Sequence, residues 1–146
     1  MELEQEILTE SNGLKDKVVL LDHKTAALWA TACAEHVLPL YEALYPGDDR
    51  PRVALEAGKA WAKGSLSTFE ARKAALSSLD ASRKAFKDGN SLASEVAHAC
   101  SHACTTTQNK EYALHTSISA CKAAGDQASE QAWQTQCLEE LLNPVS

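Results

Sequence analysis

Residues 25–44 read TAALWATACAEHVLPLYEAL, a stretch that is apolar on nearly all sides when it is wound as a helix. Such a helix is typical of the buried centre of an all-helical domain, because it has no polar face to turn toward water. Asp22 stands just before it, where a side-chain oxygen can cap the first free amides. Pro39 should bend the helix, since its ring removes one backbone hydrogen bond. We therefore expect a central helix over residues 23–44.

The rest of the chain predicts further helices separated by turn residues. Pro51 is a favourable first residue for a helix that ends before Gly64. The capping box formed by Ser67 and Glu70 opens the next helix, which reaches about residue 87. Other helices are expected over residues 3–10, 91–106, 110–124 and 127–142. Only residues 17–21, KVVLL, have a strand-like pattern.

The last of these helices, capped by Asp126, is expected to turn Trp133, Cys137 and Leu141 inward, because they recur at steps of four. Together the segments predict an all-α fold, a single-domain bundle of six to seven helices. The helical domain should occupy residues 22–146, after an N-terminal extension over residues 1–21.

Composition narrows the classes of function. The 146 residues suit one hydrophobic core, and no apolar run is long enough for a membrane-spanning helix. The net charge of −6 opposes nucleic-acid binding and favours a basic partner. The acidic start lacks the pattern of a secretory signal, and five cysteines are an odd number, so we expect a cytoplasmic protein with reduced, mostly buried thiols.

Residues 95–104, EVAHACSHAC, place two histidines and two cysteines at alternate positions. In a helix, neighbours on one face are three or four residues apart, so the cysteines form one pair and the histidines another. The histidine stripe continues to Glu95, which gives a Glu-x-x-His step of the kind used by di-iron carboxylate bundles. Those bundles need a second such step, whereas Glu111 and His115 are four residues apart.

We therefore expect no metal and no cofactor, and we predict a non-enzyme in which these side chains belong to the scaffold. The alternative is a metal-dependent helical-bundle enzyme that uses Glu95, His98 and His102. A redox role for the cysteines would need a cation or a helix N-terminus beside a thiolate, and neither Cys100 nor Cys104 lies in a first helical turn.

A longer stretch is more specific. Residues 27–64 read ALWATACAEHVLPLYEALYPGDDRPRVALEAGKAWAKG, and residues 130–142 read EQAWQTQCLEELL. Both resemble the immunity proteins of bacterial polymorphic-toxin systems, specifically the all-helical family numbered five. The resemblance spans about residues 22–142, and the first twenty residues carry none of it. It implies a small cytoplasmic protein that binds a cognate toxin and neutralises it by occlusion, without catalysis.

The candidate contacts with such a partner lie around the turn after residue 44. The turn concentrates charge, and two tyrosines precede it at steps of four. The residues concerned are Tyr41, Tyr45, Asp48, Asp49, Arg50, Arg52 and Glu56. Charged residues on a rigid turn can steer and orient a partner, and the tyrosines are expected to be exposed. The alternative is that the acids cap the following helix while the arginines pair with nearby carboxylates.

Two further questions are open at this stage. Trp29, Trp61 and Trp133 could anchor an interface, but their periodic positions beside alanine and leucine favour a place in the core. The apolar helix over residues 23–44 could be partly exposed and drive self-association. We favour a monomer that binds a protein toxin and neither nucleic acid nor a membrane.

Overall fold

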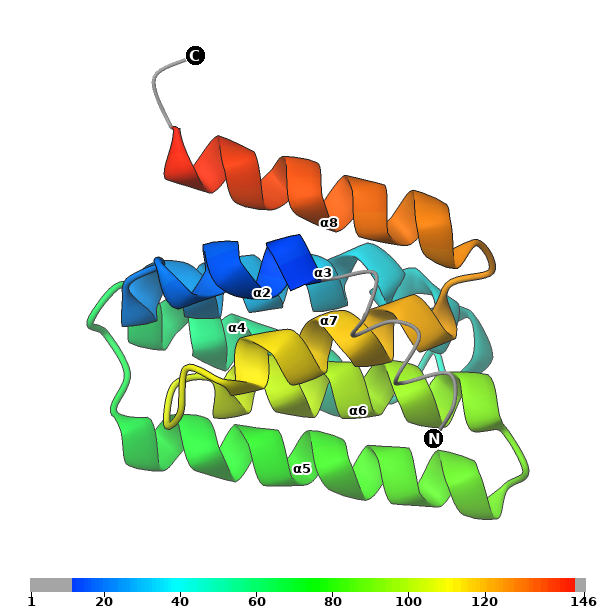
Figure 1. Cartoon of the computed structure of the whole chain (residues 1–146). Helices are drawn as coiled ribbons and strands as arrows, with labels where there is room; N and C mark the ends of the chain where they lie inside the picture. Colours follow the sequence, from blue (N-terminus) through cyan, green and yellow to red (C-terminus); the bar gives the residue numbers. More distant parts are fainter. Residues whose placement is uncertain (1–11, 144–146) are drawn as a thin grey trace.

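The computed structural model describes residues 12–143, and every regular element in this part of the chain is an α-helix (Figure 1). The elements are α2 (Asn12–Val19), α3 (His23–Leu44), α4 (Arg50–Ala62), α5 (Thr68–Lys87), α6 (Ser91–Thr105), α7 (Tyr112–Ala123) and α8 (Gln127–Leu142). The predicted all-α fold is confirmed. The helix expected over residues 3–10 lies outside the described residues.

Local side-chain caps set several helix starts. Asp22 accepts a 2.7 Å hydrogen bond from the Thr25 amide at α3, and Ser67 accepts one of 3.1 Å from the Glu70 amide at α5. Asp126 does the same for α8 with the Ser129 amide. These contacts satisfy amides that have no partner within the helix. The predicted caps of all three helices are confirmed.

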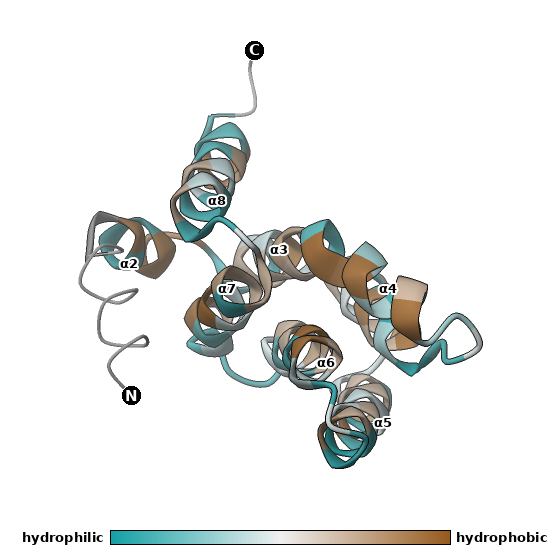
Figure 2. Cartoon of the chain, turned by 90° about the vertical axis from the view of Figure 1, so that its right-hand side faces the viewer, coloured by the Kyte–Doolittle hydropathy of each residue, from teal (hydrophilic) through white to brown (hydrophobic). Residues whose placement is uncertain are grey.

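Helix α3 is the centre of the bundle, in contact with α4, α6, α7 and α8. Figure 2 shows it between its neighbours, with α8 on one side of the molecule and α5 on the opposite side. Ten of its residues are buried, and the helix continues through Pro39. Trp29 is fully buried, and its indole nitrogen donates a 3.0 Å hydrogen bond to the Gln134 carbonyl of α8. Trp61 and Trp133 are only partly buried, so the core position predicted for the tryptophans holds for Trp29.

Helices α5 and α6 pack antiparallel through small residues whose side chains bond the facing backbone. From α5, Ser78 donates to the Ala97 carbonyl and Ser82 to the Ser94 carbonyl, both at 2.8 Å. From α6, Ser101 donates to the Ala75 carbonyl at 2.8 Å, and the Cys104 thiol to the Ala71 carbonyl at 3.0 Å. We call these four bonds the α5–α6 ladder. Such close approach requires small side chains along both helices, which explains the alanine-rich sequence.

The N-terminal part of the described chain differs from the prediction. Residues 17–21 do not form a strand: they complete α2 and the turn that follows it. Leu14, Val18 and Leu21 are buried in the same hydrophobic core as Trp29. Of the apolar residues at 18–21, Val18 and Leu21 are buried, whereas Val19 and Leu20 are 63% and 77% exposed. The domain boundary at residue 21 stays a prediction.

Helix α8 has the predicted bounds but a different inward face. Glu130, Gln134 and Leu138 are its buried residues, whereas Trp133, Cys137 and Leu141 are only partly buried. The expected inward row is therefore wrong by one position. Hydropathy alone could not identify the true face, because two of its three residues are polar and find their partners on other helices.

No helix within residues 12–143 has the length and apolar character needed to span a bilayer.

Candidate functional site

The turn between α3 and α4 is held by Tyr41, Asp48 and Arg50. Tyr41 is 1% exposed, and its hydroxyl donates a 2.7 Å hydrogen bond to Asp48 Oδ2. The Arg50 guanidinium donates to both oxygens of Asp48, at 2.9 and 2.7 Å, and the Arg50 amide adds a third bond. Arg50, and then the Tyr41 hydroxyl, hold the pKa of Asp48 well below its usual range. The expectation of an exposed Tyr41 is wrong, because its ring supports the turn from beneath.

The neighbouring charges also pair within the molecule. Arg52 donates two hydrogen bonds to Glu42, at 2.7 and 2.6 Å, in the bidentate geometry that suits a carboxylate. Asp49 stands at the N-cap of α4, but its side chain makes no capping bond, and it is exposed. Glu56 is exposed and lies 4.0 Å from Lys59. The pairing that the sequence left as an alternative is therefore present for Arg50 and Arg52, while Asp49 and Glu56 face solvent.

Tyr45 connects the turn to the end of α5. Its hydroxyl donates a 2.8 Å hydrogen bond to Asp88 Oδ2, and the Lys84 ammonium lies 5.3 Å from the centre of its ring. Lys84 also bonds Asp88 at 2.9 Å. Tyr45 is half-buried, so one side of its ring remains accessible. The turn is thus fixed at both ends by tyrosine–aspartate bonds, which makes it a rigid surface.

Partly exposed apolar residues accompany these charges on the same two helices. Leu40 and Leu44 of α3 are 38% and 48% exposed, and Val53 of α4 is 46% exposed. A surface that mixes apolar side chains with paired and unpaired charges is typical of transient protein interfaces. We call this region the turn surface: Tyr45, Asp48, Asp49, Arg50, Arg52 and Glu56 with the three apolar side chains.

The histidines form a second group. The rings of His98 and His102 lie 4.2 Å apart, and α7 brings His115 and Tyr112 to 5.7 and 5.5 Å from His102. Together with Glu95 and Lys122 the three histidines line a hollow of about 230 Å³. Glu111 is not part of that lining; it lies with His115 beside a further hollow against α2.

This group is not assembled as a metal centre. Within the described residues no three histidine, cysteine, aspartate or glutamate side chains converge closely enough to hold an ion. Burial lowers the pKa of His98 and lowers that of His102 to about 3, with His98 and His115 adding to the effect on His102. Burial disfavours the charged forms of His98 and His102, so these two imidazoles, which are tilted by 31° to each other, pack as neutral rings in a partly buried aromatic seam between α6 and α7.

The cysteines are unsuited to nucleophilic or redox chemistry. All five are free thiols, and four of them are buried. Burial raises the pKa of Cys33, Cys100 and Cys137, and that of Cys104 to about 12. Because the thiolate is the reactive form, these side chains behave as small apolar residues of the core.

Two features were missed by sequence reasoning. On α8, Glu130 bonds His36 of α3, and Gln134 bonds Ser117 of α7. Another hollow opens where α5, α6 and the start of α7 meet, and Arg72 lies at its edge. Both features combine residues that are far apart in sequence, so no local sequence pattern predicts them.

The comparisons with known proteins support one family. Residues 16–142 match the model of the family described as Imm-5 like putative immunity protein. The match begins before residue 22, where the sequence resemblance starts, and ends at the same residue. Comparison with curated proteins and with solved structures gives no significant match. The family model covers most of the chain, and the protein therefore belongs to the Imm-5 like immunity family.

Proposed function

We propose that this protein binds a cognate bacterial toxin and blocks it by occlusion, with no chemistry of its own. The observation that carries the proposal is the family match over residues 16–142. An immunity protein of this kind meets its toxin in the cytoplasm of the cell that it protects. It acts as a monomer on a protein partner, and neither nucleic acid nor a membrane is needed.

The state of the reactive side chains supports recognition over catalysis. A catalytic centre needs a nucleophile or a base with a matched pKa, held close to a third group that orients it. Cys33, Cys100 and Cys104 are buried, and burial raises their pKa values. The pKa of His102 is too low for it to act as a base near neutral pH. The metal-dependent enzyme that would use Glu95, His98 and His102 has less support, because no group of three or more possible ligands is found within the described residues.

We propose the turn surface as the part that the toxin contacts. Asp49 and Glu56 are exposed and can meet a basic partner, although Glu56 also lies 4.0 Å from Lys59. Asp48, Arg50 and Arg52 are paired at shorter distances and so present a fixed pattern of charge. A pre-organised surface binds with little loss of side-chain entropy. Tyr41 contributes by fixing Asp48 and not by contact.

The direct test is protection. The C-terminal domain of a large reading frame next to this gene would be expressed from an inducible promoter, with and without this protein. We expect the domain to arrest growth alone, growth to return on co-expression, and the two purified chains to form a one-to-one complex. Arrest that persists on co-expression, together with no complex by calorimetry, would remove the proposal.

The contact surface has its own test with a matched control. The double variant D49K/E56K reverses two exposed acids of the turn surface, and D16K/E140K reverses two exposed acids on α2 and α8. Both change the net charge equally. We expect the first pair to weaken toxin binding by about tenfold or more and the second by less than about threefold. Equal losses of affinity would mean that both variants act through long-range charge and that the toxin does not contact the turn surface.

A further inference from the structure

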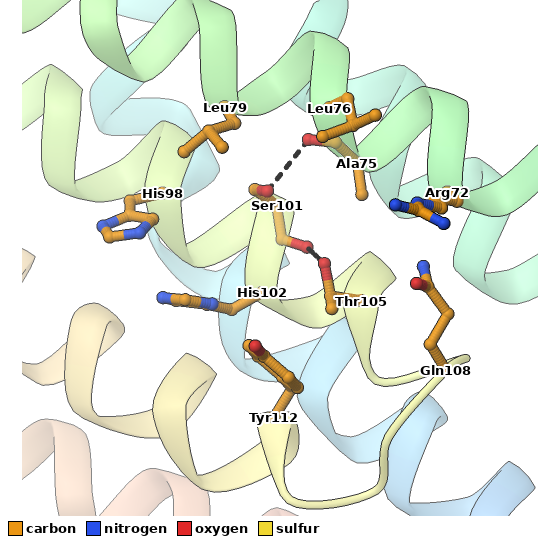
Figure 3. Close-up of a pocket in the computed structure, with 10 residues that line it drawn as sticks. All are labelled: Arg72, Ala75, Leu76, Leu79, His98, Ser101, His102, Thr105, Gln108 and Tyr112. Atoms are coloured by element: carbon orange, nitrogen blue, oxygen red, sulfur yellow. Dashed lines mark hydrogen bonds between the residues drawn. The ribbon is translucent and has the colours of Figure 1, made fainter.

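The hollow beside Arg72 lies outside the turn surface. Its volume is about 200 Å³, and it lies where α5, α6 and the start of α7 meet (Figure 3). Arg72 and Gln108 point toward each other at one end, and His98 lies at the other. Leu76 and Leu79 of α5 form one wall, opposite Tyr112. The hollow thus has a polar end, an apolar wall and an aromatic wall.

The hydrogen bonds show which of its polar groups remain available. Ser101 donates to the Ala75 carbonyl and Thr105 to the Ser101 carbonyl, so both hydroxyls are committed to the backbone. Across residues 12–143, the side chain of Arg72 has no ion pair or hydrogen bond, and the same holds for the Gln108 amide. A guanidinium beside an amide offers several donors directed at one place, which fits a carboxylate.

Charge distribution distinguishes this side of the molecule from the rest. Helix α5 carries five basic residues (Arg72, Lys73, Arg83, Lys84 and Lys87) against two acidic ones (Glu70 and Asp80). The net charge of α5 is +3, whereas that of the whole chain is −6, so the rest of the chain is strongly acidic. An acidic segment is therefore attracted to α5 and repelled by most other surfaces.

Exposed apolar side chains follow the same helix. Phe69, Leu76 and Phe86 are 66%, 51% and 71% exposed. Phe69 and Leu76 are seven residues apart, which places them on one face of α5 beside Arg72. Large apolar side chains this exposed, next to a hollow, are a common feature of binding sites.

We propose that the Arg72 hollow is an anchor pocket for an acidic segment of the protein partner, which inserts an apolar or aromatic side chain next to a carboxylate. The carboxylate pairs with Arg72 and the Gln108 amide, and the apolar side chain packs between Leu76 and Tyr112. This inference rests on the proposed function for the identity of the partner, the toxin. It places a second contact on α5–α7, separate from the turn surface.

The alternatives are less consistent with the charges. An anionic membrane would also meet a basic helix with exposed phenylalanines, but the strongly acidic remainder of the chain opposes approach to such a surface. A second copy of this chain offers acidic surfaces too, and it is an outcome of the test below.

The first experiment needs no toxin. The peptide acetyl-Asp-Phe-Asp-amide is titrated into the labelled protein and followed by NMR, with acetyl-Lys-Phe-Lys-amide as the matched control. At roughly millimolar concentration we expect the acidic peptide to shift the Arg72 Nε–H, the Gln108 side-chain amide and the Leu76 methyl signals. Absence of these shifts, or equal shifts with the basic peptide, overturns the proposal, whether or not the protein proves to be an immunity protein.

The second experiment uses the toxin domain once protection has been shown. R72E should weaken binding by about tenfold or more, and R72K, which keeps the charge but loses the planar fork, by less. L76S should also weaken it. K87E is the matched control: the same charge change on the same helix, at an exposed lysine without an ion pair in the described structure. Its expected loss is below about threefold.

The outcomes separate the two proposals. If the wild-type protein protects and R72E binds as tightly as K87E does, the anchor pocket is wrong and the immunity function stands. If light scattering shows a dimer that R72E abolishes, or if phosphatidylglycerol vesicles bind the protein and R72E abolishes that binding, the pocket serves another occupant and the proposal is overturned. Circular dichroism and thermal unfolding confirm that each variant is folded.

Discussion

The imidazole of His36 is stacked on the indole of Trp133, with 3.7 Å between the ring centres and 5° between the planes. The same imidazole lies 2.8 Å, through Nδ1, from Glu130 Oε1. One side chain of α3 therefore holds α8 in two ways, by stacking and by a polar contact. This matters because α8 lies at the edge of the bundle and fully buries only three residues.

Removal of the stacked indole should loosen α8. For W133A we expect a loss of about 2 kcal/mol in the free energy of unfolding, from lost burial and aromatic stacking. Urea unfolding measures the loss, and hydrogen exchange should show faster exchange in α8 than in α5. The control is F86A, at a side chain that is 71% exposed, with an expected loss below about 0.5 kcal/mol. An unchanged exchange rate in α8 would contradict the anchoring role.

The buried amide of Gln134 should be more costly to remove than its polarity suggests. Its oxygen accepts a 2.6 Å bond from the Ser117 hydroxyl, and its nitrogen donates to the Ser117 carbonyl at 3.2 Å. Q134A leaves both Ser117 groups without these partners and opens a cavity, so we expect a loss of about 3 kcal/mol. Chemical denaturation measures it against Q136A, an exposed glutamine two residues away on the same helix. Equal stability of the two variants would show that water replaces the amide.

Gly58 should not tolerate alanine, although it lies inside a helix. A methyl group there would lie 3.2 Å from Thr31 Oγ1, and that hydroxyl is held by a 2.8 Å hydrogen bond to the Ala27 carbonyl. The gain in helix propensity is about 1 kcal/mol, and the cost of displacing Thr31 should exceed it by a similar amount. In the T31A background the same substitution should become neutral or stabilising. A double-mutant cycle without coupling would contradict this contact.

Acid should destabilise the protein through His102. Burial lowers the pKa of His102 to about 3 in the folded protein, from 6.5 when the side chain is exposed. As pH falls, His102 is therefore protonated first in the unfolded chain. The resulting stability is fully present above pH 6.5 and is lost as pH decreases toward 3. For this group the loss at about pH 5 amounts to up to about 2 kcal/mol.

The substitution H102N tests the assignment. The titratable and charged side chains that line the same hollows as His102 are His98 and Glu95 of its own helix, Tyr112, His115 and Lys122 of α7, and Arg72 of α5. Glu95 is the one acid among them. Glu95 faces His98 and opposes the effect of burial there. Urea unfolding between about pH 7 and pH 5 should show a smaller pH dependence in H102N than in the wild type. An unchanged slope would assign the acid sensitivity to other groups.

Much of the fold could be predicted because its signals are local. The capping residues Asp22, Ser67 and Asp126 each bond an amide three residues away, so the sequence contains both partners. The starts predicted for α3, α5 and α8 agree with the structure for this reason. The central position of residues 23–44 followed from a helix with no polar face.

The errors concern partners from elsewhere in the fold. The burial of Tyr41 depends on how the turn folds back to bring Asp48 to its hydroxyl. The inward face of α8 can be polar because Gln134 bonds Ser117 of α7 and Glu130 bonds His36 of α3. The periodicity of apolar residues cannot reveal such partners. The hollow beside Arg72 is lined by residues of three helices, so no local sequence pattern could single out that residue.

The α5–α6 ladder has a consequence for the diversification of these proteins. The register of the two helices is fixed by hydroxyl and thiol groups bound to main-chain carbonyls, so it depends on very few side chains. The solvent-facing side chains of α5 make none of these four hydrogen bonds. Under the proposed function, substitutions on this outer face can therefore change which toxin is bound while the packing of α5 against α6 stays the same.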